Sequence, residues 1–289
     1  MADPEAGIAF QKGHGTENDF VLLPDPDGAL RLTEARVRAL CDRHRGLGAD
    51  GVIRVVRTGA LGEPVAAEVA DTEWFMDYRN ADGSVAEMCG NGVRVFARYL
   101  AEAGLVTEAG PGRAMVIGTR GGPKGVRFGA AGEVSVDMGP AVATGTSWAG
   151  VTGERFDGLM VDVGNPHLAC VTERDITALD LSRQPDFDPT RFPRGVNIEF
   201  VSPPRDGEVL MRVHERGVGE TRSCGTGTVA AALAALHHDG RGTGELVVRV
   251  PGGRVLVEIT ERTAVLTGPA VLLARGELSS TWWRSVDVA

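Results

Sequence analysis

Cys89-Gly90-Asn91-Gly92 and Cys224-Gly225-Thr226-Gly227 share the pattern Cys-Gly-x-Gly at positions 135 residues apart. Two later landmarks recur in the same order at nearly the same interval: Gly121-Gly122 returns as Gly252-Gly253, and Val136-Asp137-Met138-Gly139-Pro140 returns as Val265-Leu266-Thr267-Gly268-Pro269. Self-similarity at one interval indicates a repeated structural unit. The sequence therefore predicts two related halves.

A helix is expected directly after each motif. After Cys89, the apolar residues Val93, Phe96, Ala97 and Leu100 follow the spacing of one helical face. After Cys224, the segment 228–236 is nearly all alanine, valine and leucine, which is typical of a helix buried on every side. Each cysteine is thus placed at the start of a helix.

Short β-rich runs bounded by turn signals follow the second helix, at 247–250, 255–259 and 264–266. We expect a mixed α/β (α+β) protein with two pseudo-symmetric domains, each a curved, mainly antiparallel sheet wrapped around a central helix. The first domain is expected to span 1–139 and to be completed by 270–289, and the second to span 140–269. The tail with Trp282 and Trp283 is expected to pack on the first domain or a partner, and the polar segment 54–72 to be an exposed loop.

Composition excludes several classes of protein. Apolar residues make up 43% and charged residues 24% of the 289 residues, as in a globular protein. A net charge of −9 argues against a nucleic-acid surface, and no apolar run is long enough to span a bilayer. The acidic start Met1–Glu5 is unlike a secretory signal, so a cytoplasmic protein is expected.

Lysine is scarce. Lys12 and Lys124 are the only two among the 30 basic residues. A pyridoxal phosphate enzyme holds its cofactor on a lysine, and neither lysine lies in a recognisable phosphate-binding loop. We therefore expect no cofactor.

The two motif cysteines have the environment of reactive thiols. The first N–H groups of a helix are unpaired and carry partial positive charge, which favours a thiolate and attracts a carboxylate. If the two helix starts face each other across a cleft, one thiolate removes the α-proton of an amino acid while the opposite thiol protonates the other face. Cys41 and Cys170, in contrast, are expected to be small core residues.

Other interpretations of the cysteines are weaker. A single Cys-Gly-x-Gly is more often a turn than an active site. Structural zinc is disfavoured because paired Cys-x-x-Cys or His-x-x-x-His spacing is absent, so no metal is expected. A redox dithiol would also be expected to carry Cys-x-x-Cys.

Seven segments, in order over nearly the whole chain, together resemble diaminopimelate epimerase. They are Gly13–Phe20, Arg79–Ser84, Cys89–Gly92, Gly164–His167, Gly195–Asn197, and Glu215–Thr221 with Cys224–Gly227. The resemblance implies the diaminopimelate epimerase fold, an active site in the cleft between its domains, and conversion of LL- to meso-diaminopimelate for lysine and peptidoglycan synthesis.

The resemblance also implies roles for individual residues. Cys89 and Cys224 become the acid/base pair, with His167 and Glu215 tuning the thiols. Substrate binding falls to Asn18, Asn80, Gly90, Asn91, Asn165, Asn197, Glu215, Arg216, Gly225 and Thr226. An arginine beside a glutamate suits a substrate whose second end carries both charges. Glu17 and Gly51 depart from the family, which commonly has glycine at the first position and in some members a substrate-contacting glutamine at the second.

Two alternatives to this function stay open. The same architecture could serve a proline or histidine racemase, although Glu215-Arg216 favours a substrate with a second charged end. A non-catalytic protein could instead close on an amino acid between two lobes, but simple binding gives no reason for two thiols at helix starts. The expected partner is a small amino-acid substrate, with no nucleic acid or membrane, and a homodimer is a further possibility.

Overall fold

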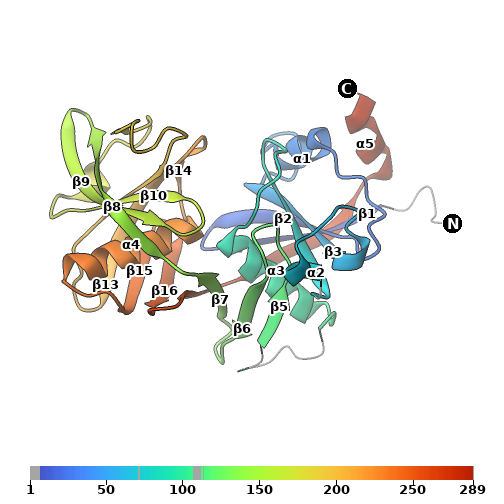
Figure 1. The fold of residues 1–289 in the computed structure, drawn as a ribbon. Helices are drawn as coiled ribbons and strands as arrows, with labels where there is room; N and C mark the ends of the chain where they lie inside the picture. The colour runs from blue at the N-terminus through green and yellow to red at the C-terminus, as the bar shows by residue number, and fades with distance from the viewer. Residues whose placement is uncertain (1–6, 71, 107–111, 113, 289) are drawn as a thin grey trace. The chain divides into compact units, whose positions relative to one another are not determined.

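The computed structural model describes residues 7–70, 72–106, 112 and 114–288. The chain forms two compact units, drawn in Figure 1. The first is made of Met1–Gly15, Asp19–Val134 and Ala270–Ala289, and the second of Thr16–Asn18 and Ser135–Pro269. The domain boundary between residues 139 and 140 remains a prediction.

The first unit is built on a five-stranded sheet in the order β18-β1-β2-β3-β4. Its strands are β1 (Ile8–Gly15), β2 (Asn18–Pro24, whose first residue belongs to the second unit), β3 (Gly51–Arg57), β4 (Trp74–Asn80) and β18 (Val271–Leu278). A hairpin of β5 (Ala114–Ile117) and β6 (Lys124–Phe128) lies outside this sheet. Its helices are α1 (Glu34–Cys41), α2 (Ala67–Ala70), α3 (Gly90–Glu102) and α5 (Ser280–Ser285), with 3-10 turns at Thr58–Ala60 and Val286–Val288. The pairs β1–β18 and β3–β4 are antiparallel, and β2–β3 is parallel.

Helix α3 packs on this sheet, touching β1, β18, β3 and β4. The apolar face predicted from sequence, Val93, Phe96, Ala97 and Leu100, is completely buried. The prediction of a helix after Cys89 is confirmed.

The second unit contains a larger sheet in the order β11-β8-β9-β10-β12-β13-β15-β16-β17-β7, with β14 paired to β13. Its strands are β7 (Val134–Gly139, whose first residue belongs to the first unit), β8 (Val142–Val151), β9 (Glu154–Asp162), β10 (Pro166–Val171), β11 (Asp186–Phe187), β12 (Asn197–Val201), β13 (Glu208–Glu215), β14 (Gly219–Thr221), β15 (Gly244–Val250), β16 (Gly253–Ile259) and β17 (Ala264–Gly268). A 3-10 turn lies at Ile176–Ala178, and the helix is α4 (Gly225–His238). Most neighbours are antiparallel, but β10–β12 and β13–β15 are parallel.

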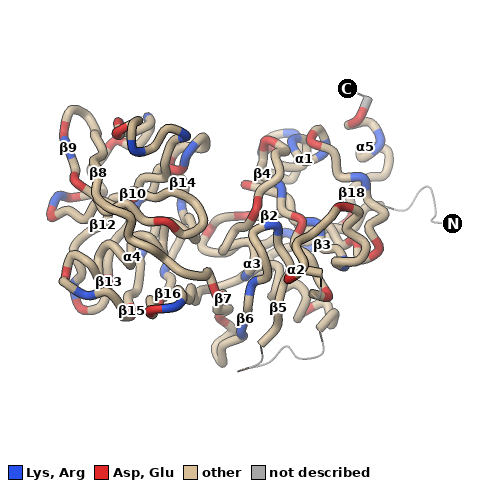
Figure 2. The backbone as a smooth tube through the Cα atoms, in the orientation of Figure 1, with Lys and Arg blue, Asp and Glu red and all other residues tan. Residues whose placement is uncertain are grey.

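Helix α4 is the centre of the second unit, where it touches strands β9, β10, β12, β13, β15, β16 and β17. It carries no lysine, arginine, aspartate or glutamate, and its tube is tan along its length in Figure 2. Every residue from Thr228 to Leu236 is buried, as the sequence predicts for a helix surrounded by protein. A sheet-rich unit around a central helix therefore occurs twice, which confirms the predicted fold class.

The prediction of an exposed loop at 54–72 is wrong at both ends of that segment. Arg54 lies in β3 and its guanidinium donates to the buried carboxylate of Asp77 at 2.9 Å. The hydroxyls of Thr58 and Thr72 are buried and bonded to each other at 2.9 Å. Polar side chains that satisfy one another inside a protein have the same composition as an exposed loop.

The C-terminal residues belong to the first unit. β18 pairs with β1 from Ile8↔Leu278 to His14↔Val271. Trp283 is buried in a cluster with Val37 and Leu40 of α1, and the Arg36 guanidinium lies 4.5 Å from its ring centroid. The tail thus packs within the chain itself, on the first unit.

Candidate active site

Cys89 and Cys224 hold the same position on their helices. Each is the N-cap, with extended backbone (φ −143°, ψ 115° for Cys89; φ −125°, ψ 120° for Cys224). Each sulfur accepts a hydrogen bond from the N–H three residues later, that of Gly92 or Gly227, at 3.4 Å. Both thiols are therefore held against the positive end of a helix, one in each unit.

The surroundings of Cys224 oppose the helix end. Its side chain is buried, and desolvation followed by the nearby carboxylates of Glu215 and Glu199 raises its pKa well above 9, despite the Gly227 N–H. The thiol hydrogen-bonds to the Glu215 carboxylate. The expectation that the helix terminus makes this thiol more acidic is wrong for Cys224, because burial and the two neighbouring carboxyl groups outweigh the helix end.

Glu215 ends β13, and its carboxylate also accepts from the hydroxyl of Thr221 on β14. Burial raises the pKa of Glu215, and these hydrogen bonds oppose the shift. The next residue, Arg216, has an exposed side chain whose guanidinium donates to the Arg194 carbonyl at 3.3 Å. Glu215 therefore contacts the Cys224 thiol, whereas the side chain of Arg216 is exposed to solvent.

His167 lies on β10 and is inaccessible to solvent. Its Nδ1 is 2.7 Å from Oε1 of Glu199 on β12, and its Nε2 is 3.0 Å from Oδ1 of Asn165. The Asn165 amide donates onward to the Thr226 hydroxyl at 3.5 Å, and that hydroxyl lies 3.6 Å from the Cys224 sulfur. A polar chain thus connects the sheet to the Cys224 loop.

Asn197 is buried at the start of β12, and both ends of its amide bond to backbone. Its Nδ2 donates to the Pro166 carbonyl at 3.3 Å, and its Oδ1 accepts from the Arg216 N–H at 3.0 Å. Asn197 therefore fixes the chain where Arg216 begins. The second unit brings together Asn165, His167, Asn197, Glu215, Arg216 and the Cys224–Thr226 turn.

In the first unit, Asn91 and Arg94 of α3 are buried, and Arg94 donates to the Asn91 side chain at 3.0 Å. Burial lowers the pKa of Arg94 to about 10, and Cys89 opposes this shift. A buried guanidinium therefore lies close enough to Cys89 to stabilise its thiolate. Asn80 ends β4, where its amide donates to Ser84 at 3.0 Å.

Asn18 follows a two-residue turn, Thr16-Glu17, that joins β1 to β2. Both turn residues have positive φ, 51° and 62°, as a type I′ hairpin requires. Glycine relieves such strain, which gives a physical reason for glycine in the family at position 17. Here the turn is held by Thr16 bonded to Ser223 at 2.8 Å and by Glu17 paired with Arg222.

At Gly51, the other departure from the family, there is no room for a side chain. A Cβ there would lie 2.5 Å from the Tyr78 ring and 2.6 Å from the Arg79 carbonyl oxygen. A glutamine at this position would require both to move. The ring of Tyr78 therefore occupies the space beside this backbone.

The remaining cysteines are core residues, as predicted. Cys41 and Cys170 are buried, and desolvation raises the pKa of Cys41 to about 12 and that of Cys170 still further. Among the described residues, no group of three histidine, cysteine or acidic side chains could hold a metal. In the same part of the chain, no helix is both long and apolar enough to cross a bilayer.

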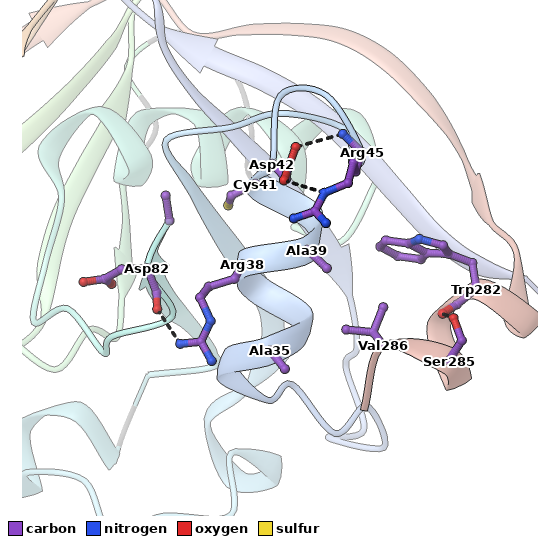
Figure 3. Close-up of a pocket in the computed structure, with 11 residues that line it drawn as sticks. Ala35, Arg38, Ala39, Cys41, Asp42, Arg45, Asp82, Trp282, Ser285 and Val286 are labelled. Atoms are coloured by element: carbon purple, nitrogen blue, oxygen red, sulfur yellow. Dashed lines mark hydrogen bonds and ion pairs between the residues drawn. The ribbon is translucent and has the colours of Figure 1, made fainter. Parts of the chain in front are cut away.

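A cavity of about 720 Å³ lies in the first unit, with Cys41 among its lining residues (Figure 3). Arg38 of α1 and Arg45, which follows that helix, line one side, bonded to the Asp82 carbonyl and the Asp42 carboxylate, and Trp282 lines the other. None of the residues predicted to bind substrate contributes to it. Its volume alone does not make it a site.

Sequence reasoning missed Glu199 and Arg94. Glu199 had a detectable signal, since it is a lone acid within the apolar strand 196–201, two residues after Asn197 and so on the same face. Arg94 had no such signal, because an arginine on a helix is usually solvated. Its burial is a tertiary property.

The diaminopimelate epimerase family profile matches residues 10–144 and 159–273. The diaminopimelate epimerase of Rhodococcus opacus (strain B4) is 57% identical over 291 residues, covering 96% of this chain and 99% of that protein. The diaminopimelate epimerase of Mycobacterium tuberculosis (strain ATCC 25177 / H37Ra) is 56% identical over 292 residues, covering 96% and 100%.

Solved structures show the same fold at low identity. A hydroxyproline epimerase from Agrobacterium vitis has a TM-score of 0.67 at 15% identity, covering 94% of this chain and 92% of that one. A Bacillus anthracis protein of the PhzF family also has a TM-score of 0.67, at 16% identity, with 94% and 99% covered. At such identities the likeness concerns the fold alone.

Proposed function

Because the chain belongs to the diaminopimelate epimerase family, we propose that it converts LL-diaminopimelate to meso-diaminopimelate in lysine and peptidoglycan precursor synthesis. The observation that carries the mechanism is the matched position of Cys89 and Cys224, each capping a helix through its sulfur. The proposal is a two-base reaction without a cofactor. The substrate α-carbon lies between the two sulfurs, in a cleft between the domains.

One proton leaves and one arrives. The Cys89 thiolate takes the α-proton, and the electrons of the broken C–H bond remain as a carbanion. The Cys224 thiol then gives its proton to the opposite face, so the configuration is inverted and the thiolate passes from one sulfur to the other. In the reverse direction the two cysteines exchange roles.

The environments of the cysteines suit these starting states. Arg94 stabilises a thiolate at Cys89, whereas burial and the neighbouring carboxylates keep Cys224 protonated. For the reverse direction, Glu215 accepts the Cys224 proton through its hydrogen bond to that thiol. Each sulfur thus has its own partner: a guanidinium that stabilises the Cys89 thiolate, and a carboxylate that takes the Cys224 proton.

The α-carboxylate is bound by the two helix starts. The first N–H groups of an α-helix have no acceptor within the helix and attract an anion. Gly90 and Asn91 lead α3, and Gly225 and Thr226 lead α4. Such donors also stabilise charge developing on the carboxylate, with a single donor worth about 2.7–4 kcal/mol in a closed site.

The far end of the substrate carries a second ammonium and carboxylate. Arg216, exposed and held by Asn197, is the residue that binds this carboxylate. The amide side chains of Asn18, Asn80 and Asn165 supply the polar contacts around the zwitterion. His167 acts by orienting Asn165.

We also propose domain bounds, a cellular location and an oligomeric state. The domains are 1–139 with 270–289, and 140–269. The enzyme acts in the cytoplasm as a homodimer, without nucleic acid or membrane partners. Analytical ultracentrifugation of the purified chain tests the dimer, and a single species at 30.4 kDa would remove it.

The decisive experiment is ¹H NMR of LL-diaminopimelate in D₂O with enzyme and no added cofactor. We expect loss of the α-proton signal together with appearance of the meso isomer. Cys89→Ala and Cys224→Ala should abolish inversion, while Cys170→Ala, in the core of the second unit, serves as the matched control. Turnover of proline but not diaminopimelate would overturn the substrate, and full activity in either active-site mutant would overturn the two-thiol mechanism.

Mild oxidation gives an independent test of the arrangement. Two sulfurs that flank one carbon come close together when the substrate leaves. Peptide mapping should then find a reversible Cys89–Cys224 disulfide. A main disulfide to Cys41 or Cys170 would contradict the arrangement.

A further inference from the structure

Glu199 is a carboxylate without solvent access, set in an apolar strand. It lies on β12, whose neighbour β10 runs parallel with His167 opposite Asn197. Two residues further along, Glu199 points from the same face of the sheet as Asn197, toward the start of α4. A Cβ on Gly227 would lie 2.7 Å from its Oε1, so the carboxylate is packed against the first turn of that helix.

Burying such a group is costly, and little is returned in stability. Oε1 is bonded to the Nδ1 of His167 at 2.7 Å. Oε2 is buried and has no partner among the residues that the structure describes. Desolvation raises the pKa of Glu199, and His167 opposes that shift. A buried acid kept at this expense points to a role other than packing.

The contacts of His167 define where its proton is. Nε2 faces the amide oxygen of Asn165 at 3.0 Å, and an amide oxygen can only accept, so Nε2 carries hydrogen. Nδ1 then shares one proton with Glu199, either as imidazolium with carboxylate or as neutral imidazole with carboxylic acid. In both forms Glu199 keeps the hydrogen on Nε2.

Asn165 transmits this orientation. With its oxygen turned to His167, its Nδ2 is directed at the Thr226 hydroxyl, 3.5 Å away, and that hydroxyl lies 3.6 Å from the Cys224 sulfur. If the hydrogen moved from Nε2 to Nδ1, the Nε2 lone pair would face the Asn165 oxygen, and the amide would turn over. Its NH₂ would then no longer point to the Cys224 turn.

We propose that Glu199 is a positioning residue of the active site, which fixes the tautomer and ring orientation of His167 and so the orientation of Asn165 toward the Cys224 turn. The inference rests on the proposed function for its kinetic consequence, but the tautomer itself is independent of it. Glu199 touches no reacting atom and acts through His167.

The test uses three variants of the full-length enzyme. Glu199→Met keeps the volume but cannot bond Nδ1, whereas Glu199→Gln can donate its amide hydrogen to Nδ1 and preserve hydrogen on Nε2. Cys170→Ala, one residue along on β10 from the position that pairs with Glu199, is the control for core disturbance alone. We expect Glu199→Met to lower kcat about 100-fold with KM changed less than about threefold, since positioned acid–base groups contribute roughly 10²–10⁴. Glu199→Gln should retain activity within about tenfold.

A double mutant separates positioning from general damage. If Glu199 acts through His167, then adding Glu199→Met to His167→Ala should cost less than about twofold more. Multiplying losses would overturn the proposal, as would wild-type kcat in Glu199→Met or an equal loss in Cys170→Ala.

The direct readout is the His167 tautomer, from long-range ¹H–¹⁵N spectra of the uniformly ¹⁵N-labelled protein assigned with His167→Ala. We expect the Nε2–H pattern in the wild type and in Glu199→Gln, and a change of pattern in Glu199→Met. An unchanged pattern in Glu199→Met overturns the inference. Because this spectrum needs no turnover, it stands even if the wild-type protein fails to epimerise diaminopimelate, an outcome that would refute the proposed function alone.

Discussion

Gly227→Ala should damage the second unit, although the same change in the twin motif, Gly92→Ala, should be harmless. A Cβ on Gly227 would lie 2.7 Å from Oε1 of Glu199, which is closer than carbon and oxygen tolerate. That oxygen cannot withdraw freely, because it is bonded to His167 at 2.7 Å. A Cβ on Gly92 would meet Ile53 Cδ1 at 3.3 Å, the far end of a flexible side chain.

The expected magnitude follows from these contacts. Overpacking lowers the free energy of unfolding by about 1–3 kcal/mol, and loss of a hydrogen bond to a charged group lowers it by about 1.5–3 kcal/mol. Alanine has a higher helix propensity than glycine, which offsets this loss by at most about 1 kcal/mol. We expect Gly227→Ala to lose about 2 kcal/mol, or about 6 °C in Tm for a unit of this size, and Gly92→Ala to stay within about 0.5 kcal/mol.

Differential scanning calorimetry of the two variants beside the wild type measures the difference. The reasoning requires asymmetry between motifs whose sequences are alike. Equal losses in both variants, or an unchanged Tm in Gly227→Ala, would refute the placement of Glu199 beneath α4.

Three further predictions concern cysteine reactivity and the first unit. At pH 7.5 iodoacetamide should modify the half-buried Cys89 well before Cys224, because the raised pKa of Cys224 keeps it a protonated thiol. Modification of Cys224 should accelerate only as the pH rises beyond 9. Equal modification rates of the two cysteines at pH 7.5, measured by mass spectrometry, would contradict this. Asp77→Asn removes the carboxylate that pairs with three arginines at 2.8–2.9 Å, so urea unfolding should show a loss of about 3–5 kcal/mol, and a loss below about 1 kcal/mol would count against a stabilising role. Gly51→Ala should lower the Tm of the first unit, because its Cβ would meet the Tyr78 ring at 2.5 Å and a backbone carbonyl at 2.6 Å; overpacking of about 1–3 kcal/mol is expected, and an unchanged calorimetric trace would argue that the ring is free to move.

The sequence predictions that were confirmed depend on short-range patterns along the chain. The helices after Cys89 and Cys224 follow from apolar spacing, and the strands at 247–250, 255–259 and 264–266 from β-rich runs between turns. These features depend on neighbours within a few residues. The interval between the two Cys-Gly-x-Gly motifs was then enough to predict that the two helices occupy equivalent positions in related halves.

The features that sequence could not supply depend on distant residues. The positive helix end near Cys224 was predictable, but its effect on the thiol pKa is outweighed by burial and by carboxylates that come from β13 and β12. The pairing of Arg54 with Asp77 likewise joins two strands of a sheet. A charged residue gives no sign in sequence of whether its partner is water or another strand.

The pairing of β18 with β1 has a consequence for the order in which the molecule forms during synthesis. Nearly all of the second unit is one continuous stretch, which is synthesised before residues 270–289. Until then β1 lacks its neighbour at the edge of the sheet, and the apolar surface of α1 lacks Trp283. The half that is translated first is thus the last to be finished, and until its last strand arrives it exposes an unpaired edge of the kind that promotes aggregation.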